Sequence, residues 1–131
     1  MVDTYLAGVD PIKIVPGIVP ALALQVLTST IIEKIQKNGG NALGLDLSEG
    51  PFLVVLVNCM LDNTADDEAV ITAISEMMDK ITVEAKASNK FNEYIYMNYA
   101  SKYQSVMESY GPANHDCLIE IAQKYDPHQV F

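Results

Sequence analysis

The chain has 131 residues, half of them hydrophobic, which is the size and composition of one domain with a real core. Its 17 acidic residues face only eight lysines and no arginine, for a formal net charge of −9. This balance argues against a protein that binds nucleic acid or an anionic membrane surface. The absence of arginine also removes the usual clamp for phosphate groups, so nucleotide chemistry is not expected.

Two cysteines, Cys59 and Cys117, are too few and too far apart for a disulfide framework or a zinc knuckle. Both are interpreted as buried free thiols, which fits a reducing compartment. The first residues lack the basic segment of a secretory signal, and the apolar stretch 12–32 is interrupted by a lysine and two prolines. We therefore expect a cytoplasmic protein without a membrane span.

The first two predicted strands are short. Residues 12–15 favour a strand that ends at Pro16-Gly17, and residues 21–27 favour a second one because they are apolar and partly β-branched. Gln25 is the only polar side chain within that second run, and Leu27 shares its face. Gln25 is interpreted either as a pocket residue or as an amide at the edge of the sheet.

A short helix is predicted from Thr28 to Lys37. The hydroxyl residues 28–30 offer N-caps, and Asn38-Gly39-Gly40 ends the helix as a C-cap and turn. A phosphate cradle would need the opposite order of strand, glycines and helix. Residues 41–50 are expected to form a loop, and the buried stripe of the helix is predicted to be Ile31, Ile32 and Ile35.

Residues 52–61 form the most apolar stretch and predict a central strand covered on both sides. Asn58 and Met60 share one face of it. A buried Asn58 would need hydrogen-bonding partners, since an unsatisfied amide costs roughly 1–3 kcal/mol. Structural hydrogen bonding and ligand orientation both remain open for Asn58.

The acidic cluster 62–68 is interpreted as the start of a long helix through residue 87. The glycine and glutamate of an EF-hand loop are missing, whereas Thr64 can cap a helix and acids in the first turn suit its dipole. Apolar residues then recur at steps of three and four, which predicts a buried stripe. The stripe consists of Val70, Ile74, Met77, Ile81 and Ala85.

Residues 94–99 alternate polar and apolar side chains and predict a fourth strand. In a strand, Tyr94, Tyr96 and Asn98 would lie in a row on one face and could form the floor of a small-molecule pocket. The alternative is an ordinary sheet strand with half-buried tyrosines. A last helix is predicted from Pro112, with an apolar face formed by Leu118, Ile121, Ala122 and Tyr125.

These elements predict an α+β fold, a single domain over residues 1–131 with a mostly antiparallel sheet of about four strands and helices packed on it. His115 and His128, the only histidines, are expected at the surface, so a Ser-His-Asp or Cys-His site is not predicted. The remaining phenols and amides suit orienting an organic molecule or moving a proton next to a carbonyl.

The second half of the chain resembles a known family. The runs 94–100, 103–104, 109–111 and 124–127, together with Asn114 and the run 38–45, resemble the substrate domain of fungal FAD-linked oxidases of the berberine bridge enzyme-like group, within the vanillyl-alcohol-oxidase superfamily. The resemblance covers most of residues 12–131. It implies a ferredoxin-like half of a flavoprotein substrate domain, in which the strand at 94–99 lines the substrate site.

Nothing in the chain corresponds to the family's FAD-binding domain, so no cofactor is expected. One hypothesis is a stand-alone enzyme of secondary metabolism that catalyses a non-redox step: cyclisation, pericyclic closure, isomerisation or dehydration. Tyr94, Tyr96 and Asn98 would be catalytic, and Gln25, Leu27, Asn58 and Met60 would bind substrate. The alternative is a non-catalytic module that complements a separate FAD-binding protein. Uncovered edges and apolar patches also predict a homodimer.

Overall fold

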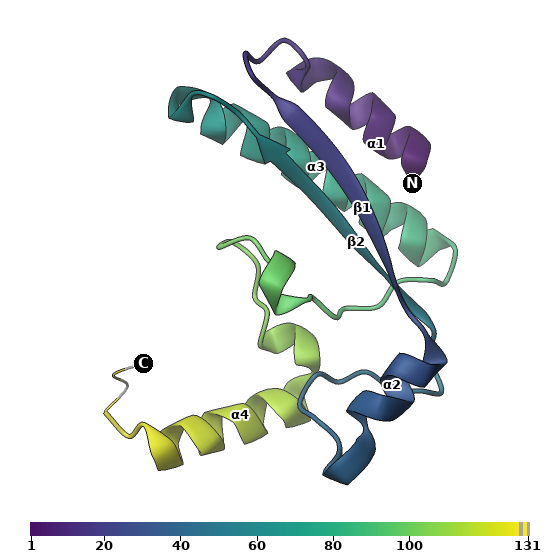
Figure 1. The fold of residues 1–131 in the computed structure, drawn as a ribbon, viewed down its shortest axis with the longest axis vertical. Coiled ribbons are helices and arrows are strands. Elements are labelled where there is room, and N and C mark those ends of the chain that lie inside the picture. The colour runs from purple at the N-terminus through teal and green to yellow at the C-terminus, as the bar shows by residue number, and fades with distance from the viewer. Residues whose placement is uncertain (129, 131) are drawn as a thin grey trace. The chain divides into compact units, whose positions relative to one another are not determined.

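The computed structural model describes residues 1–128 and 130, and for Asn38 the backbone alone. Helices and two strands follow one another along the chain, joined by short 3₁₀ turns (Figure 1). The elements are α1 (Val2–Val9), β1 (Val19–Leu27), α2 (Ser29–Ile35), β2 (Phe52–Met60), α3 (Asp67–Ala87) and α4 (Pro112–Tyr125). The mixture of helices and strands agrees with the predicted α+β class.

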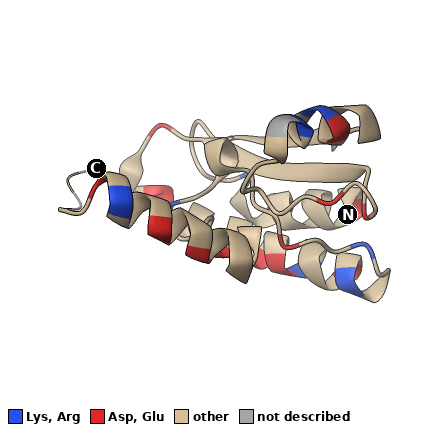
Figure 2. Cartoon of the chain, turned by 90° about the horizontal axis from the view of Figure 1, so that it is seen from below, with Lys and Arg blue, Asp and Glu red and all other residues tan. Residues whose placement is uncertain are grey.

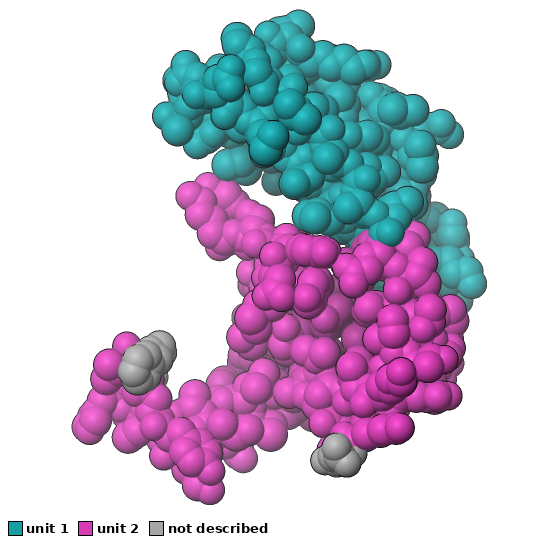
Figure 3. Space-filling view, in the orientation of Figure 1, with its two compact units in different colours: residues 1–24, 55–92 teal, residues 25–54, 93–131 magenta. Residues whose placement is uncertain are grey.

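The chain divides into two compact units, which Figure 3 colours separately. Unit 1 comprises Met1–Leu24 and Val55–Asn92. It contains α1, α3, residues 19–24 of β1 and residues 55–60 of β2. Unit 2 comprises Gln25–Val54 and Glu93–Phe131, and it holds α2, α4 and the remaining parts of the strands.

The described residues form one sheet of two strands, in which β1 pairs antiparallel with β2. The prediction of about four strands is therefore wrong. The segment 12–15 is a 3₁₀ turn and bend instead, because the chain runs directly from α1 into Asp10–Ile12 with Pro11 in the first turn. Its backbone N–H groups donate to nearby carbonyl groups, from Lys13 N to Val9 O and from Val15 N to Ile12 O. These groups therefore do not pair with another strand.

The core of unit 1 lies between α1 and α3. Val9, Met77 and Ile81 are buried together, and Val57 of β2 packs against them. Gly8 of α1 allows the Met77 side chain of α3 to lie close to its backbone, because a Cβ atom at Gly8 would lie only 2.8 Å from that side chain. The predicted stripe of α3 is confirmed at Val70, Met77 and Ile81, which are buried, while Ile74 and Ala85 are half-buried.

The start of α3 differs from the prediction, because the helix begins at Asp67 after a 3₁₀ turn and has no side-chain cap of its own. Asn63, rather than Thr64, caps the segment, since its Oδ1 accepts a hydrogen bond of 3.0 Å from the backbone N–H of Ala65. Thr64 begins a 3₁₀ turn that leads into the helix. Asp67 and Glu68 lie in the first turn of α3, as expected for acids near the positive end of a helix dipole.

Strand β2 is not the central strand that its apolar run predicts. It pairs with β1 alone in the described sheet, so no second neighbouring strand covers it. Asn58 is exposed and Met60 is 66% exposed. The interpretation of Asn58 as a buried amide is wrong, because Asn58 is exposed whereas its neighbour Val57 packs against the core of unit 1.

Unit 2 buries a few apolar side chains. Thr28 caps α2 as predicted, accepting a hydrogen bond of 3.3 Å from Ile31 N. Ile32 is completely buried, but Ile31 is exposed, so the predicted stripe of α2 is narrower than expected. Among the described residues of this unit, Leu45 and Tyr110 are the other buried ones.

Helix α4 begins at Pro112 as predicted, but its apolar face is not covered. Every residue of α4 is exposed or half-buried, and Ile121 and Tyr125 are among the exposed ones. Cys117 is exposed on the same helix, which corrects the expectation of a buried thiol. Cys59 on β2 is half-buried, and burial raises the pKa of its thiol.

Candidate functional site

The tyrosine segment, residues 94–99, is not a strand. Its first residues have no regular structure, and Met97–Tyr99 form a 3₁₀ turn. The backbone N–H of Ile95 donates to the side-chain oxygen of Ser109 at 3.1 Å instead of to a neighbouring strand. Ser109 is itself held by donating to the carbonyl of Val106 at 2.6 Å. The Ser109 hydroxyl therefore accepts the hydrogen bond that a neighbouring strand would accept in a sheet.

The 3₁₀ turn brings together residues that a strand would separate. Three residues complete one turn, so Tyr96 and Tyr99 lie on the same side. Their rings meet edge to face, with centroids 4.8 Å apart and planes at 81°. Asn98 Nδ2 donates a hydrogen bond of 2.9 Å to the phenol oxygen of Tyr96. Two of the three predicted catalytic residues, Tyr96 and Asn98, are thus in direct contact.

Tyr94 has a different environment. Its ring stacks on the buried ring of Tyr110, with centroids 5.8 Å apart and planes at 22°. Burial raises the pKa of Tyr94, and the neighbouring Tyr110 and Tyr96 phenols add to the shift because their negative charges would repel a Tyr94 phenolate. Burial likewise raises the pKa of Tyr110. The raised pKa makes Tyr94 a weaker acid than an exposed tyrosine.

The predicted substrate-binding residues divide between the two units. Gln25 and Leu27 lie on β1 in unit 2, the unit of the tyrosine segment, where Gln25 is exposed and Leu27 half-buried. Asn58 and Met60 lie on β2 in unit 1, and both are exposed. Within the described part of the chain, no hydrogen bond or ring contact joins any of these four residues to the tyrosine segment, so their role in a common site stays a prediction.

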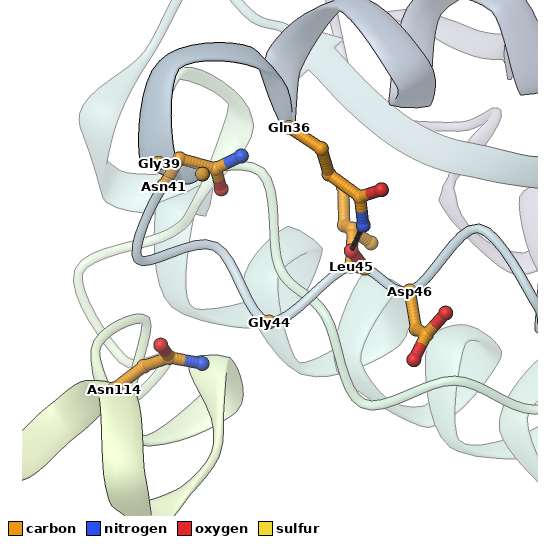
Figure 4. A pocket seen from close by; sticks show the side chains of 8 residues that line it. Gln36, Gly39, Asn41, Gly44, Leu45, Asp46 and Asn114 are labelled. Atoms are coloured by element: carbon orange, nitrogen blue, oxygen red, sulfur yellow. Dashed lines mark hydrogen bonds between the residues drawn. The ribbon is translucent and has the colours of Figure 1, made fainter.

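Unit 2 also contains a polar pocket that the sequence did not indicate (Figure 4). We call it the amide pocket, because carboxamide side chains and glycine backbone form most of its wall. Its volume is about 480 Å³, and it opens broadly to solvent. Its lining residues are Gln36, Gly39, Gly40, Asn41, Gly44, Leu45, Asp46 and Asn114. The only signal in the sequence is the unusual density of glycine and asparagine between residues 38 and 44.

Hydrogen bonds to backbone carbonyls hold the amides of the pocket in place. Gln36 Nε2 donates to Leu45 O at 2.9 Å, and Asn41 Nδ2 donates to Ile35 O at 2.7 Å. Asn114 Nδ2 donates to Tyr110 O at 2.8 Å. In each case the amide nitrogen is used, which leaves the side-chain oxygen of Gln36 and of Asn114 available as a hydrogen-bond acceptor within the part of the chain that the structure describes.

Tyr110 links the amide pocket to the tyrosine segment. Its ring stacks on Tyr94, while its carbonyl oxygen receives the Asn114 amide. Gly44 lies against the same carbonyl, and a Cβ atom at this position would collide with it. Gly44 also has a φ of +71°, which side chains other than glycine rarely adopt. The pocket therefore depends on a glycine at this contact.

The chemistry of the amide pocket does not fit FAD. Asp46 accepts hydrogen bonds from the Ser48 backbone at 2.7 Å and the Ser48 hydroxyl at 2.8 Å, and these lower the pKa of its carboxyl group. An ionised carboxylate would repel a pyrophosphate, and none of the lining residues is a lysine. Leu45 is the single apolar side chain, too little to enclose an aromatic ring system. The pocket suits a small polar or hydroxylated group.

Other classes of site are not found among the described residues. They contain no group of three or more His, Cys, Asp or Glu side chains that could hold a metal ion. Of the helices that the structure describes, none is long and apolar enough to cross a membrane. His128 is exposed, and the half-buried His115 has Nδ1 3.7 Å from the exposed carboxylate of Asp116.

Comparison with known proteins finds fungal flavoenzymes. The chain is 34% identical over 112 residues to FAD-dependent monooxygenase FUP4 of Fusarium proliferatum, covering 86% of this chain and 22% of the relative. It is 33% identical over 112 residues to FAD-dependent monooxygenase tpcD of Cochliobolus heterostrophus, with the same shares covered. It is 38% identical over 93 residues to FAD-dependent monooxygenase AOL_s00215g279 of Arthrobotrys oligospora, covering 71% of this chain and 18% of that protein.

No family model matches the chain, and no solved structure matches it. A match of 112 residues must include residues 20–112 wherever it begins, so the tyrosine segment lies inside the similar region. The chain spans about a fifth of the length of the curated relatives it matches. It therefore resembles one part of the fungal FAD-dependent monooxygenases.

Proposed function

We propose that this chain forms the substrate-contacting part of an enzyme of fungal-type secondary metabolism, with the tyrosine segment as its contact surface. An FAD-binding part outside these 131 residues supplies the oxidation. Similarity to FAD-dependent monooxygenases over 86% of this chain supports the enzyme class. The poor fit of the amide pocket to FAD supports an enzyme in which this chain contacts the substrate and another part binds FAD.

The observation that carries the proposal is the hydrogen bond from Asn98 to Tyr96. The Tyr96 oxygen accepts from the amide, so its own proton is directed away from Asn98 and is available to an acceptor on a bound molecule. The Asn98 carbonyl oxygen adds an acceptor beside this donor. A donor and an acceptor next to the edge-to-face pair of Tyr96 and Tyr99 suit a hydroxylated aromatic ketone.

Direct titration of the chain tests this proposal. Hydroxyacetophenone, an aromatic ring with a hydroxyl and a carbonyl group, serves as the probe, and NMR amide shifts report the contact surface. We expect saturable shifts centred on residues 94–99, weakened by Tyr96→Phe and by Asn98→Ala. Tyr103→Phe is the matched control, because that tyrosine is exposed and lies outside the segment. The proposal would be contradicted if Tyr96→Phe and Asn98→Ala both gave the same shifts and affinity as the wild-type chain.

Titration with FAD tests whether the cofactor is bound outside this chain. We expect the fluorescence anisotropy of FAD to stay unchanged on addition of the chain, because the pyrophosphate finds no cationic partner in the amide pocket. Saturable FAD binding would show that this chain holds the cofactor itself. That result would contradict the two-part enzyme while leaving the substrate contact at the tyrosine segment open to its own test.

A second function, catalysis of a non-redox step by the chain alone, is favoured by the position of the Tyr94 phenol, which is half-buried in the tyrosine segment and stacked on Tyr110. A phenol that stays protonated can donate a proton to a carbonyl oxygen during cyclisation, isomerisation or dehydration. Incubation of the purified chain with intermediates from the source organism separates the two functions. A stand-alone enzyme yields products without an added flavoprotein, and Tyr94→Phe abolishes the activity. The two-part enzyme predicts no conversion by the chain alone.

A further inference from the structure

Two consecutive residues, Ser109 and Tyr110, hold the start of the tyrosine segment. Ser109 Oγ accepts a hydrogen bond of 3.1 Å from the backbone N–H of Ile95. The Tyr110 ring stacks on the ring of Tyr94. All four residues belong to unit 2. The first of these contacts is directional, because a hydrogen bond to a backbone N–H constrains both the distance and the angle of the donor.

The turn that carries Ser109 is fixed by its own backbone. The N–H of Ser109 donates to the carbonyl oxygens of Ser105 and Val106, at 3.2 and 3.1 Å. The carbonyl oxygen of Tyr110 accepts a hydrogen bond of 2.8 Å from the Asn114 amide. These bonds use backbone atoms of the turn, so they can remain when the Ser109 side chain is shortened.

A hydroxyl group suits this position because it can accept one hydrogen bond and donate another. The Ser109 hydroxyl donates to the Val106 carbonyl at 2.6 Å and accepts from the N–H of Ile95. Val106 O also accepts the backbone N–H of Ser109, so it keeps a partner without the hydroxyl. Loss of the hydroxyl therefore acts mainly on Ile95 and on the residues that follow it.

The remainder of the segment keeps its shape through a local bond. The Tyr99 N–H donates to the Tyr96 carbonyl at 2.9 Å, which closes the 3₁₀ turn. Residues 94–99 include no charged side chain, so an ion pair of their own cannot anchor them; Figure 2 marks the charged residues of the chain. Neutral contacts, the hydrogen bond at Ile95 and the ring stack at Tyr94, attach the segment to the turn that carries Ser109.

We propose that Ser109 is a positioning residue of the substrate-contacting surface. Its hydroxyl holds Ile95, and through this backbone contact it sets how the next residues present the Tyr96 phenol and the Asn98 amide to a ligand. The inference rests on the proposed function, because it concerns the same surface. Ser109 acts through the backbone of the segment and not by touching the ligand.

Ser109→Ala tests this role, with Ser105→Ala as the matched control. Ser105 is exposed, and its bond to Ser109 uses the backbone carbonyl, which alanine keeps. In the NMR titration with hydroxyacetophenone, we expect Ser109→Ala to weaken binding by about two- to tenfold, the effect of losing one hydrogen bond. Ser105→Ala should bind as the wild-type chain does. Urea unfolding gives the folded fraction of each variant.

A double-mutant cycle separates positioning from a general loss of stability. In a chain that already carries Tyr96→Phe and Asn98→Ala, adding Ser109→Ala should change the affinity by less than about twofold, because the groups that it positions are gone.

Two NMR signals report the conformation of the segment without a ligand. They are the hydrogen-exchange rate of the Ile95 amide and the NOE between the Asn98 side-chain amide and the Tyr96 ring. Ser109→Ala should speed the exchange and weaken the NOE, whereas Ser105→Ala should change neither.

The positioning role and the proposed function fail in different ways. Wild-type affinity in Ser109→Ala, or an equally large loss of affinity in the Tyr96→Phe, Asn98→Ala chain, would overturn the positioning role and leave the proposed function standing. Affinity that is insensitive to both segment variants would contradict the proposed function itself. If the probe does not bind, the exchange rate and the NOE decide, and no change of either in Ser109→Ala would overturn the positioning role.

Discussion

Asn98 Nδ2 lies 2.9 Å from the phenol oxygen of Tyr96 and donates a hydrogen bond to it. The two residues are separated by Met97 alone, and the 3₁₀ turn of Met97–Tyr99 closes the distance between them. Because Asn98 is exposed and Tyr96 half-buried, the pair adds little to the core. Its placement at the surface, with a donor and an acceptor side by side, favours a role in contact with a ligand.

Asn98→Ala is expected to weaken binding of hydroxyacetophenone by about two- to tenfold, which corresponds to the loss of one hydrogen bond of about 0.5–1.5 kcal/mol. The free energy of unfolding should change by no more than a similar amount. NMR titration gives the affinity, and urea unfolding gives the stability. Loss of stability with unchanged affinity would show that the pair is structural.

The stability of the chain is expected to fall at alkaline pH because of Tyr94 and Tyr110. Burial raises the pKa of both phenols above the ordinary value of 10.0. The folded state then keeps protons that the unfolded state loses, so the stabilisation is complete below 10.0 and is lost as pH rises through the folded-state pKa. Urea unfolding at a series of pH values measures this slope.

Tyr110→Phe keeps the stacked ring and removes one titrating group, so the alkaline slope should become shallower. Tyr125→Phe is the control, because Tyr125 is exposed and should leave the slope unchanged. Burial raises the pKa of the Cys59 thiol too, so that all variants must keep Cys59 for the comparison. A slope that is identical in all three proteins would contradict the assignment to Tyr110.

Gly44→Ala is expected to destabilise unit 2 more than Gly39→Ala. Both glycines have positive φ, +71° and +98°, which costs an alanine about 1–2 kcal/mol. At Gly44 a Cβ atom also collides with the carbonyl oxygen of Tyr110, whereas at Gly39 no atom lies within 4 Å. Thermal unfolding of the two variants measures the difference. Equal destabilisation would mean that the loop does not lie against Tyr110 in solution.

Met77→Ala is expected to reduce the free energy of unfolding by about 2–5 kcal/mol, since a buried methionine leaves a cavity between α1 and α3. Met60→Ala removes the same side chain from an exposed position on β2 and should change stability by less than about 0.5 kcal/mol. Urea unfolding compares the two variants. A large effect of Met60→Ala would indicate that Met60 is buried against a partner.

Several elements could be predicted because their signals are local. The spacing of Val70, Met77 and Ile81 specifies the buried face of α3 whatever surrounds it, and Pro112 sets the first turn of α4. Thr28 caps α2 through a bond to a residue three positions away. The apolar run 52–60, with three valines, favours a strand by its local composition.

The tyrosine segment could not be predicted because distant residues decide its conformation. Alternation at 94–99 favours a strand, but Ser109 takes the backbone N–H of Ile95 and Tyr110 stacks on Tyr94. Neither contact can be read from the sequence of residues 94–99, because Ser109 and Tyr110 lie outside it. The amide pocket was missed for a similar reason, since Gly44 and Asn114 meet only through the carbonyl of Tyr110.

The metabolite profile of the source organism tests the central claim most directly. The coding sequence is replaced by one that carries both Tyr96→Phe and Asn98→Ala, with Tyr103→Phe as the control strain. A substrate-contacting part of a flavin oxidase predicts accumulation of a precursor that is less oxidised than the final product, visible by mass spectrometry. An unchanged profile, or a precursor with the same mass as the product, would contradict the account.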